Sequence, residues 1–261
     1  MSRRSLLRLG AAGAVGGLAA CAEGEGIGGL FTRERSAGGP DYSAGRLGAR
    51  PRDNIRGPAP SGMQQLGSKA GDGFLYVPEG YDPATPAPLA MTLHGAGGEA
   101  ERGLDLFLDY ADERGVILVA PKARSQTWDV ILGGFGSDVA SIGRVLQDVF
   151  SSYAIDDRNL AISGFSDGAS YALTLGLTNG DLFSHVIAFS PGFTAEEQRR
   201  GKPPVFISHG TRDGVLPIDQ TSRQIVPRLE DAGYDVTFVE FDGGHVRRPQ
   251  ITGRAMEWWL D

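Results

Sequence analysis

A serine flanked by glycines is the first feature of this 261-residue sequence that points to chemistry. Residues 164–168 read Gly-Phe-Ser-Asp-Gly, directly after an apolar stretch at 160–163 and directly before a helix-length segment. This context is typical of a nucleophile elbow, a tight strand-to-helix turn that exposes the serine hydroxyl at a helix N-terminus. We therefore predict that Ser166 is a nucleophile.

An acid and a histidine follow Ser166 at comparable places. Asp213 comes just after the apolar stretch 205–209, and His245 comes just after the stretch 236–241. Read separately, Asp213 is compatible with a turn or helix cap and His245 with a surface histidine. Together they follow the serine in the chain order of α/β hydrolases, at strand ends that meet at one edge of a parallel sheet. The pattern predicts a Ser166, Asp213 and His245 triad.

A glycine-rich loop provides the donors that such a triad needs. Residues 93–98 read Leu-His-Gly-Ala-Gly-Gly after the apolar stretch 89–93, which matches the type of loop that stabilises an oxyanion. We expect the oxyanion hole to consist of the backbone N–H of Asp167 and one from Gly95 or Ala96. We expect His94 to brace this loop, and we keep His94 and Trp128 as candidate substrate-binding residues.

Apolar runs and helix-length segments alternate from residue 63 onward. Strands are expected at 63–66, 73–77, 89–93, 116–120, 160–163, 186–190, 205–209 and 236–241. Helices are expected at 101–114, 138–153, 167–177, 218–232 and 249–260, with Asp138 as an N-cap. This order predicts an α/β fold with a mostly parallel eight-stranded sheet, an antiparallel first hairpin and helices on both faces.

Residues 63–261 resemble an α/β-hydrolase-fold esterase, similar to the phospholipase/carboxylesterase and polyhydroxybutyrate-depolymerase-like group. The resemblance rests on the segments 94–98, 153–156, 164–168, 209–217 and 243–245. It implies a serine hydrolase that cleaves carboxylic esters through an acyl-enzyme, without a cofactor. The group often has a second glycine after the elbow, where this chain has Ala169, a side chain small enough for close helix packing.

The substrate is less constrained than the chemistry. The segment 191–204 is too short for a helical cap domain, so we expect an open, shallow pocket suited to soluble or polymer-end esters. Several polar side chains follow two predicted strands, and they are either solvated loop charges or contacts for an anionic or carbohydrate substrate: Lys122, Arg124, Gln126, Arg247 and Arg248. The open alternatives are a polyhydroxybutyrate, feruloyl or acetyl-carbohydrate esterase, a peptidase, a carbon–carbon hydrolase, and a surface lipoprotein that only binds.

The first twenty residues have the features of an export signal. Two arginines, Arg3 and Arg4, precede a short apolar run that resembles the twin-arginine type, and Leu-Ala-Ala-Cys at 18–21 resembles a lipobox. The alternative is an ordinary signal-peptidase site with an incidental Cys21. Residues 21–62 hold ten glycines and four prolines, which predicts a flexible tether before a catalytic domain at 63–261. We therefore expect an extracytoplasmic protein anchored to the membrane by a lipid on Cys21.

Composition excludes other classes. Lysine and arginine total 25 against 32 acidic residues, a formal net charge of −7, and an acidic surface repels nucleic-acid phosphates. The single cysteine excludes an internal disulfide and a cysteine-based metal site. The four histidines show no metal-ligand spacing, so we expect no metal.

Overall fold

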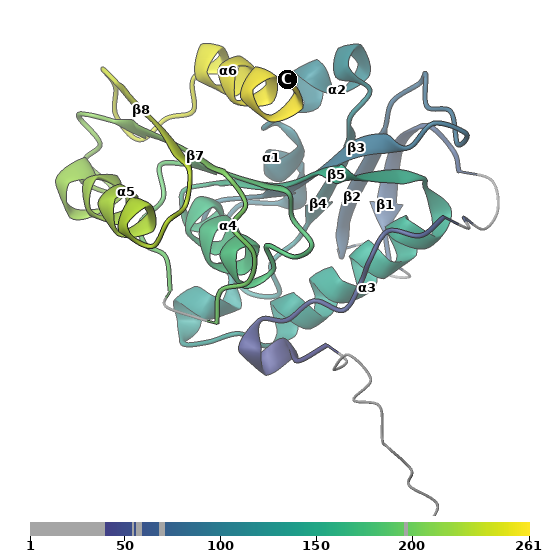
Figure 1. Ribbon diagram of the computed structural model, residues 1–261, viewed down its shortest axis with the longest axis horizontal. Helices are drawn as coiled ribbons and strands as arrows, with labels where there is room; N and C mark the ends of the chain where they lie inside the picture. Colours follow the sequence, from purple (N-terminus) through teal and green to yellow (C-terminus); the bar gives the residue numbers. More distant parts are fainter. Residues whose placement is uncertain (1–39, 54, 56–58, 68–70, 196–197) are drawn as a thin grey trace, which may run out of the picture. The chain divides into compact units, whose positions relative to one another are not determined.

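The computed structural model describes residues 40–53, 55, 59–67, 71–195 and 198–261. Within them, eight strands form one sheet in the order β1-β2-β4-β3-β5-β6-β7-β8 (Figure 1). The strands are β1 (Gly62–Leu66), β2 (Gly73–Val77), β3 (Ala87–Leu93), β4 (Ile117–Pro121), β5 (Ile155–Phe165), β6 (His185–Phe189), β7 (Val205–Gly210) and β8 (Val236–Phe241). The first two pair antiparallel and β2 runs antiparallel to β4, whereas the strands from β3 to β8 are parallel. The predicted fold class is confirmed.

Helices cover both faces of the sheet because its central strands are apolar on both sides. On one face lie α3 (Ser137–Ser152), α4 (Asp167–Thr178) and α5 (Ser222–Asp231). On the other lie α1 (Ala100–Leu104), α2 (Leu108–Arg114) and α6 (Pro249–Leu260) (Figure 1). Adjacent residues of β3 contribute to different layers of the core: Met91 packs with α3 and α4, and Ala90 packs with α1 and α6.

Two predicted helices are interrupted. The segment 101–114 forms α1 and α2, separated by a tight turn in which Leu106 and Phe107 donate to carbonyls three residues earlier. Both of these adjacent side chains are buried in the core on this face of the sheet. The segment 218–232 begins as a 3-10 turn, η3 (Ile218–Gln220), and α5 follows only after Thr221 leaves helical backbone angles.

The segment 40–53, which we assigned to the tether, packs against the domain. Leu47 is 2% exposed and belongs to the same core as α3 and α4. Its N–H donates to Asn179 Oδ1 at 2.9 Å, and Arg46 donates to the carbonyl of Thr178 and pairs with Asp181. The expected domain start at 63 is therefore wrong, because the buried Leu47 and polar contacts at the C-terminal end of α4 hold a segment whose apolar pattern predicts no structure. The predicted signal, Cys21 and tether residues up to 39 lie outside the described residues.

Candidate active site

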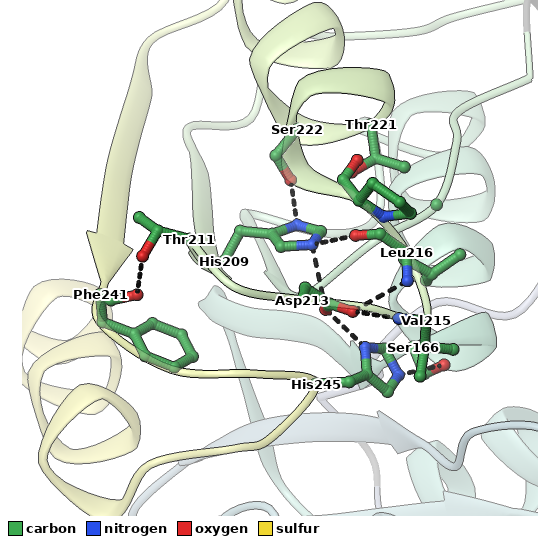
Figure 2. Close-up of polar contacts among 12 residues, drawn as sticks. Ser166, His209, Thr211, Asp213, Val215, Leu216, Thr221, Ser222, Phe241 and His245 are labelled. Carbon is green, nitrogen blue, oxygen red and sulfur yellow. Dashed lines mark hydrogen bonds and ion pairs between the residues drawn. The ribbon is translucent and has the colours of Figure 1, made fainter.

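The three predicted triad residues leave the sheet at one edge. Ser166 directly follows β5, Asp213 follows β7 and His245 follows β8. Since these strands are parallel, their carboxyl ends lie on the same side, and loops from distant parts of the chain meet there. Figure 2 shows the three side chains in a row.

Ser166 occupies a strained turn. Its backbone has φ 58° and ψ −121°, outside the regions that non-glycine residues prefer. The turn packs closely on both sides: a Cβ at Gly164 would overlap the carbonyl of Gly168, and one at Gly168 would overlap that of Leu93. The two glycines of the motif are therefore steric requirements of the elbow, and the helix α4 begins immediately after the serine.

Hydrogen bonds join the three side chains. Ser166 Oγ lies 2.9 Å from His245 Nε2, and His245 Nδ1 lies 2.6 Å from Asp213 Oδ2 (Figure 2). The carboxylate accepts a hydrogen bond from Nδ1–H, which fixes the tautomer and leaves Nε2 free to accept the serine proton. The structure thus brings together the residues that the sequence singled out, in the geometry that an activated serine needs.

Backbone amides hold the carboxylate of Asp213. Its Oδ1 accepts from the N–H groups of Val215 at 2.9 Å and Leu216 at 2.8 Å. Burial disfavours the charged form, but the bonds from Leu216, His245 and Val215 outweigh it and hold the pKa of Asp213 below its ordinary value. The carboxylate is therefore ionised and fixed in orientation beneath His245.

A second histidine contacts the same carboxylate, and the sequence analysis assigned it no role. His209 is fully buried, with Nε2 3.2 Å from Asp213 Oδ2 and 2.8 Å from the carbonyl oxygen of Leu216 (Figure 2). Both neighbours are acceptors, so Nε2 carries the proton, and Nδ1 accepts from Ser222 Oγ at 2.7 Å. Burial lowers the pKa of His209, so the ring is neutral. The signal in the sequence was a histidine four residues before the predicted acid, at the end of the same strand.

The predicted oxyanion loop lies beside the nucleophile. A Cβ at Gly95 would be 3.3 Å from Ser166 Cβ, and Gly97 N–H donates to Gln126 carbonyl at 2.6 Å, which ties the loop down. In the described part of the chain, the N–H groups of Gly95, Ala96 and Asp167 have no acceptor. These are the donors that the sequence named.

Comparison with known proteins supports the chemistry that this geometry allows. Residues 134–258 match the sequence profile of the Phospholipase/Carboxylesterase family. The chain is 23% identical over 229 residues to feruloyl esterase C of Emericella nidulans, covering 75% of this chain and 83% of that protein. It is 30% identical over 167 residues to the putative esterase NocK of Nocardia uniformis, covering 59% of this chain and 46% of that protein.

Solved structures show the same fold. The crystal structure of esterase PE8 matches with a TM-score of 0.60 at 23% identity, covering 72% of this chain and 96% of that one. A thermostable esterase matches with a TM-score of 0.61 at 22% identity, covering 72% of this chain and 57% of that one. The protein is an α/β-hydrolase-fold esterase.

The side chains of His94 and Trp128 are buried and do not line the active-site surface of the esterase. His94 is 2% exposed, with Nε2 accepting from Ala123 N–H at 3.1 Å and Nδ1 2.8 Å from the carbonyl oxygen of Gly95. Burial lowers the pKa of His94, in keeping with a neutral ring that accepts a hydrogen bond. Trp128 is fully buried, donates from Nε1 to the carbonyl of His94 and stacks on Tyr171. These contacts are consistent with the bracing role predicted for His94, whereas the burial of both side chains shows that the predicted substrate contact through His94 or Trp128 is wrong.

Asp138 has a different role from the one predicted. It lies in the first turn of α3 and is buried, with its carboxylate accepting from the N–H groups of Arg124 and Asp129, each at 2.7 Å. Asp129 instead accepts from Gly136 and Asp138 N–H and so serves the start of α3. Burial raises the pKa of Asp138. The residue therefore ties α3 to the loop 122–136, from which Thr127 donates to Asp167 beside the nucleophile.

The remaining surroundings of the esterase site are open. The described residues between β6 and β7 contain no helix or strand, in agreement with the absence of a helical cap predicted from the length of that segment. Lys122 pairs with Glu99 and Arg124 with Asp72, so these two cations are engaged within the protein.

Across the described residues, no group of three His, Cys, Asp or Glu is arranged to hold a metal ion. In that same part of the chain, no helix has the length and apolar character to cross a membrane.

Proposed function

We propose that Ser166, His245 and Asp213 hydrolyse carboxylic esters through an acyl-enzyme. Ser166 Oγ attacks the ester carbonyl while His245 Nε2 takes its proton, and the same atom then returns the proton to the leaving alcohol. Water, deprotonated by His245, attacks the acyl-enzyme and releases the acid. The observation that carries this proposal is the continuous hydrogen-bond chain from Ser166 Oγ through His245 to Asp213.

The N–H groups of Asp167 and of Ala96 or Gly95 stabilise the tetrahedral intermediates in this mechanism. Each donor of this kind contributes about 3 to 4 kcal/mol to the transition state. Support comes from the position of the loop against Ser166 and from the absence of a competing acceptor for these groups in the described chain. The network through Asp129, Asp138 and Thr127 keeps Asp167 in place while charge develops.

An open site favours esters that are accessible in solution or at the end of a polymer over deeply buried long acyl chains. A feruloyl or acetyl-carbohydrate ester is the second candidate, supported by the relatives that are described as feruloyl esterase C and as a bifunctional acetylxylan esterase/xylanase. A panel of acetyl, butyryl, octanoyl and feruloyl esters, with peptide amides and polyhydroxybutyrate, separates these substrates. If kcat/KM were highest for peptide amides, the site would be assigned as a peptidase site rather than an esterase site.

Labelling with a fluorophosphonate tests the mechanism directly, because only an activated serine reacts quickly. We expect rapid labelling of the wild type and none of Ser166→Ala. Ser151→Ala is the matched control, since in the described part of the chain this half-buried α3 serine donates only to the Gln147 carbonyl. A Ser166→Ala protein that retained wild-type turnover would refute the assignment.

We also propose that the esterase is exported through its twin-arginine-type signal and held at the cell membrane by a lipid on Cys21. The support is the order of four sequence features: the arginine pair, the apolar run, the lipobox and the glycine-rich spacer. Cys21→Ser should release active enzyme from the membrane fraction, and Arg3→Lys with Arg4→Lys should leave a longer form in the cytoplasm. A Cys21→Ser protein that stayed membrane-bound in high salt would refute the lipid anchor.

A further inference from the structure

A cavity of about 340 Å³ opens beside His245, outside the hydrogen-bond chain of the triad. It is formed by the end of β5, the oxyanion loop, α1 with the turn after it, and the loop after β8. The lining residues that matter here are Gly95, Arg102, Asp105, Phe165, His245 and Arg247. Arg102 and Asp105 have no role in the triad or the oxyanion loop, and Arg247 is one of the cations for which the sequence left open a solvated loop charge or a contact with an anionic or carbohydrate substrate.

The chemistry decides which half of the ester lies in this cavity. His245 Nε2 lies 2.9 Å from Ser166 Oγ and is the atom that returns the proton to the leaving oxygen. The leaving alcohol must therefore be on the His245 side of the tetrahedral centre. Since His245 itself lines the cavity, the alcohol half of the ester extends into it.

The walls combine an apolar surface with positive charge. The ring of Phe165 is half-buried, with its centroid 4.8 Å from that of the His245 ring, and it offers a flat apolar face. Arg247 is half-buried and donates from Nη1 to the carbonyl of Leu106 at 3.2 Å, which orients its guanidinium. Its other N–H groups have no partner among the residues that the structure describes. An arginine held in this way is suited to bind a carboxylate through two hydrogen bonds.

The charges that line the cavity differ from those of the whole chain. The protein has a formal net charge of −7, whereas the cavity lining has two guanidinium groups, Arg102 and Arg247, against one carboxylate, Asp105. Within the described residues neither arginine forms an ion pair, unlike Lys122 and Arg124 nearby. Unpaired cations beside a catalytic histidine raise the local concentration of anionic substrates and orient them.

We propose that this cavity is a leaving-group subsite that favours esters of an alcohol or phenol carrying a carboxylate, with Arg102 and Arg247 as its specificity-determining residues. The subsite rests on the proposed roles of Ser166 and His245. Its ligand class is that of hydroxy acids, in which the ester oxygen and a carboxylate belong to one small molecule. The carboxylate end of a hydroxy-acid oligomer has the same arrangement.

Two chromogenic esters that differ only in charge test the proposal. They are 3-carboxy-4-nitrophenyl butyrate and its uncharged counterpart, 3-carbamoyl-4-nitrophenyl butyrate. The acyl group is identical, and in both phenols the varied group is meta to the leaving oxygen. We expect kcat/KM to be about tenfold higher for the carboxylate ester at low ionic strength, through one or two partly exposed charge-assisted contacts. This ratio should decrease in 0.5 M salt, where the Debye length is only about 4 Å.

Substitutions of opposite sign separate a charge effect from a general loss of structure. Arg102→Gln and Arg247→Gln should each lower the ratio, and Asp105→Asn should raise it. Arg144→Gln is the matched control, because Arg144 is an exposed arginine of α3 on the other face of the sheet, and its ratio should equal that of the wild type. Equal kcat/KM for the two esters in the wild type, or an unchanged ratio in both arginine variants, would overturn the subsite while leaving the triad intact.

A binding measurement makes the subsite testable without turnover. Calorimetric titration of Ser166→Ala with 3-hydroxybenzoate and 3-hydroxybenzamide should give a lower Kd for the carboxylate, and Arg247→Gln on the same background should remove the difference. If Ser166→Ala bound 3-hydroxybenzoate more tightly and the wild type hydrolysed neither ester, the proposed function would be refuted and the anion subsite retained. If the wild type hydrolysed both esters and the two Kd values were equal, the subsite would be refuted and the proposed function retained.

Discussion

His209 supports the carboxylate of Asp213 from below, and its replacement is the sharpest test of how the triad is held. The buried imidazole donates from Nε2 toward Leu216 carbonyl and Asp213 Oδ2 and accepts from Ser222 Oγ. Leucine is of comparable size and has no donor or acceptor. His209→Leu therefore removes every polar contact of the ring while keeping the space filled.

The structure allows the size of the effect to be worked out for stability and rate separately. His209→Leu leaves the Leu216 carbonyl and the Ser222 hydroxyl buried without their partner, at about 1–3 kcal/mol each. We expect the free energy of unfolding to decrease by about 2–6 kcal/mol. Asp213 keeps its bonds from Val215, Leu216 and His245, so the rate loss should be about tenfold, far below the roughly 10⁴-fold expected for loss of the acid's function.

Two companion variants assign these losses to separate contacts. In His209→Gln the amide nitrogen can occupy the position of Nε2, so kcat should recover to within about threefold of the wild type. Ser222→Ala keeps the Nε2 contacts and should lower stability by about 1 kcal/mol with little change in kcat. The assays are urea unfolding and kcat and kcat/KM for 4-nitrophenyl butyrate from pH 5 to pH 9.

The positioning role has a signature that general destabilisation lacks. His209→Leu changes a hydrogen bond to the carboxylate that polarises His245, so the acid limb of the pH–rate profile should shift, and His209→Gln should move it back. A folded His209→Leu enzyme with wild-type kcat and an unshifted profile would show that the contact with Asp213 has no part in catalysis.

Three further outcomes are expected. Leu47→Ala should lower the free energy of unfolding by about 2–4 kcal/mol with kcat unchanged, because the segment 40–53 packs at the opposite end of α4 from Ser166; urea titration showing no loss would contradict this packing. Arg46 lowers the pKa of Asp181 to about 2, so its stabilisation should be complete above about pH 3.8 and decrease as the pH falls toward 2, and melting of wild type and Asp181→Asn from pH 2 to 5 should converge at the acid end. Activity should be insensitive to EDTA, because the proposed mechanism uses only Ser166, His245 and Asp213; inhibition by chelator that zinc or manganese reverses would contradict a metal-free mechanism.

Much of the catalytic centre could be predicted from the sequence because its signals are local. The elbow glycines are required by backbone contacts within the 164–168 turn and with the neighbouring strand end, so they lie beside the nucleophile that they expose. Alternation of apolar runs with helix-length segments predicts parallel strands, and parallel strands place the residues that follow them at one edge. Ser166, Asp213 and His245 were therefore identifiable without any knowledge of which loops touch.

The tertiary structure alone decided which polar groups meet across long distances in the chain. A side chain at a strand end has the same sequence context whether it contacts the substrate or packs into the core. Trp128 stacks on Tyr171 and His94 packs against Trp128, so both candidate side chains are buried. Segment 40–53 shows the same limit, because its composition predicts flexibility, whereas the side chain of Asn179, more than a hundred residues away, accepts from Leu47 N–H and donates to the Gly45 carbonyl and so holds the segment in place. Arg102 lies on α1 and Arg247 follows β8, and only the packing of these distant segments beside the end of β5 creates a positively charged cavity at His245. Periodicity and spacing describe what one segment does alone, and these contacts exist only once the segments are packed together.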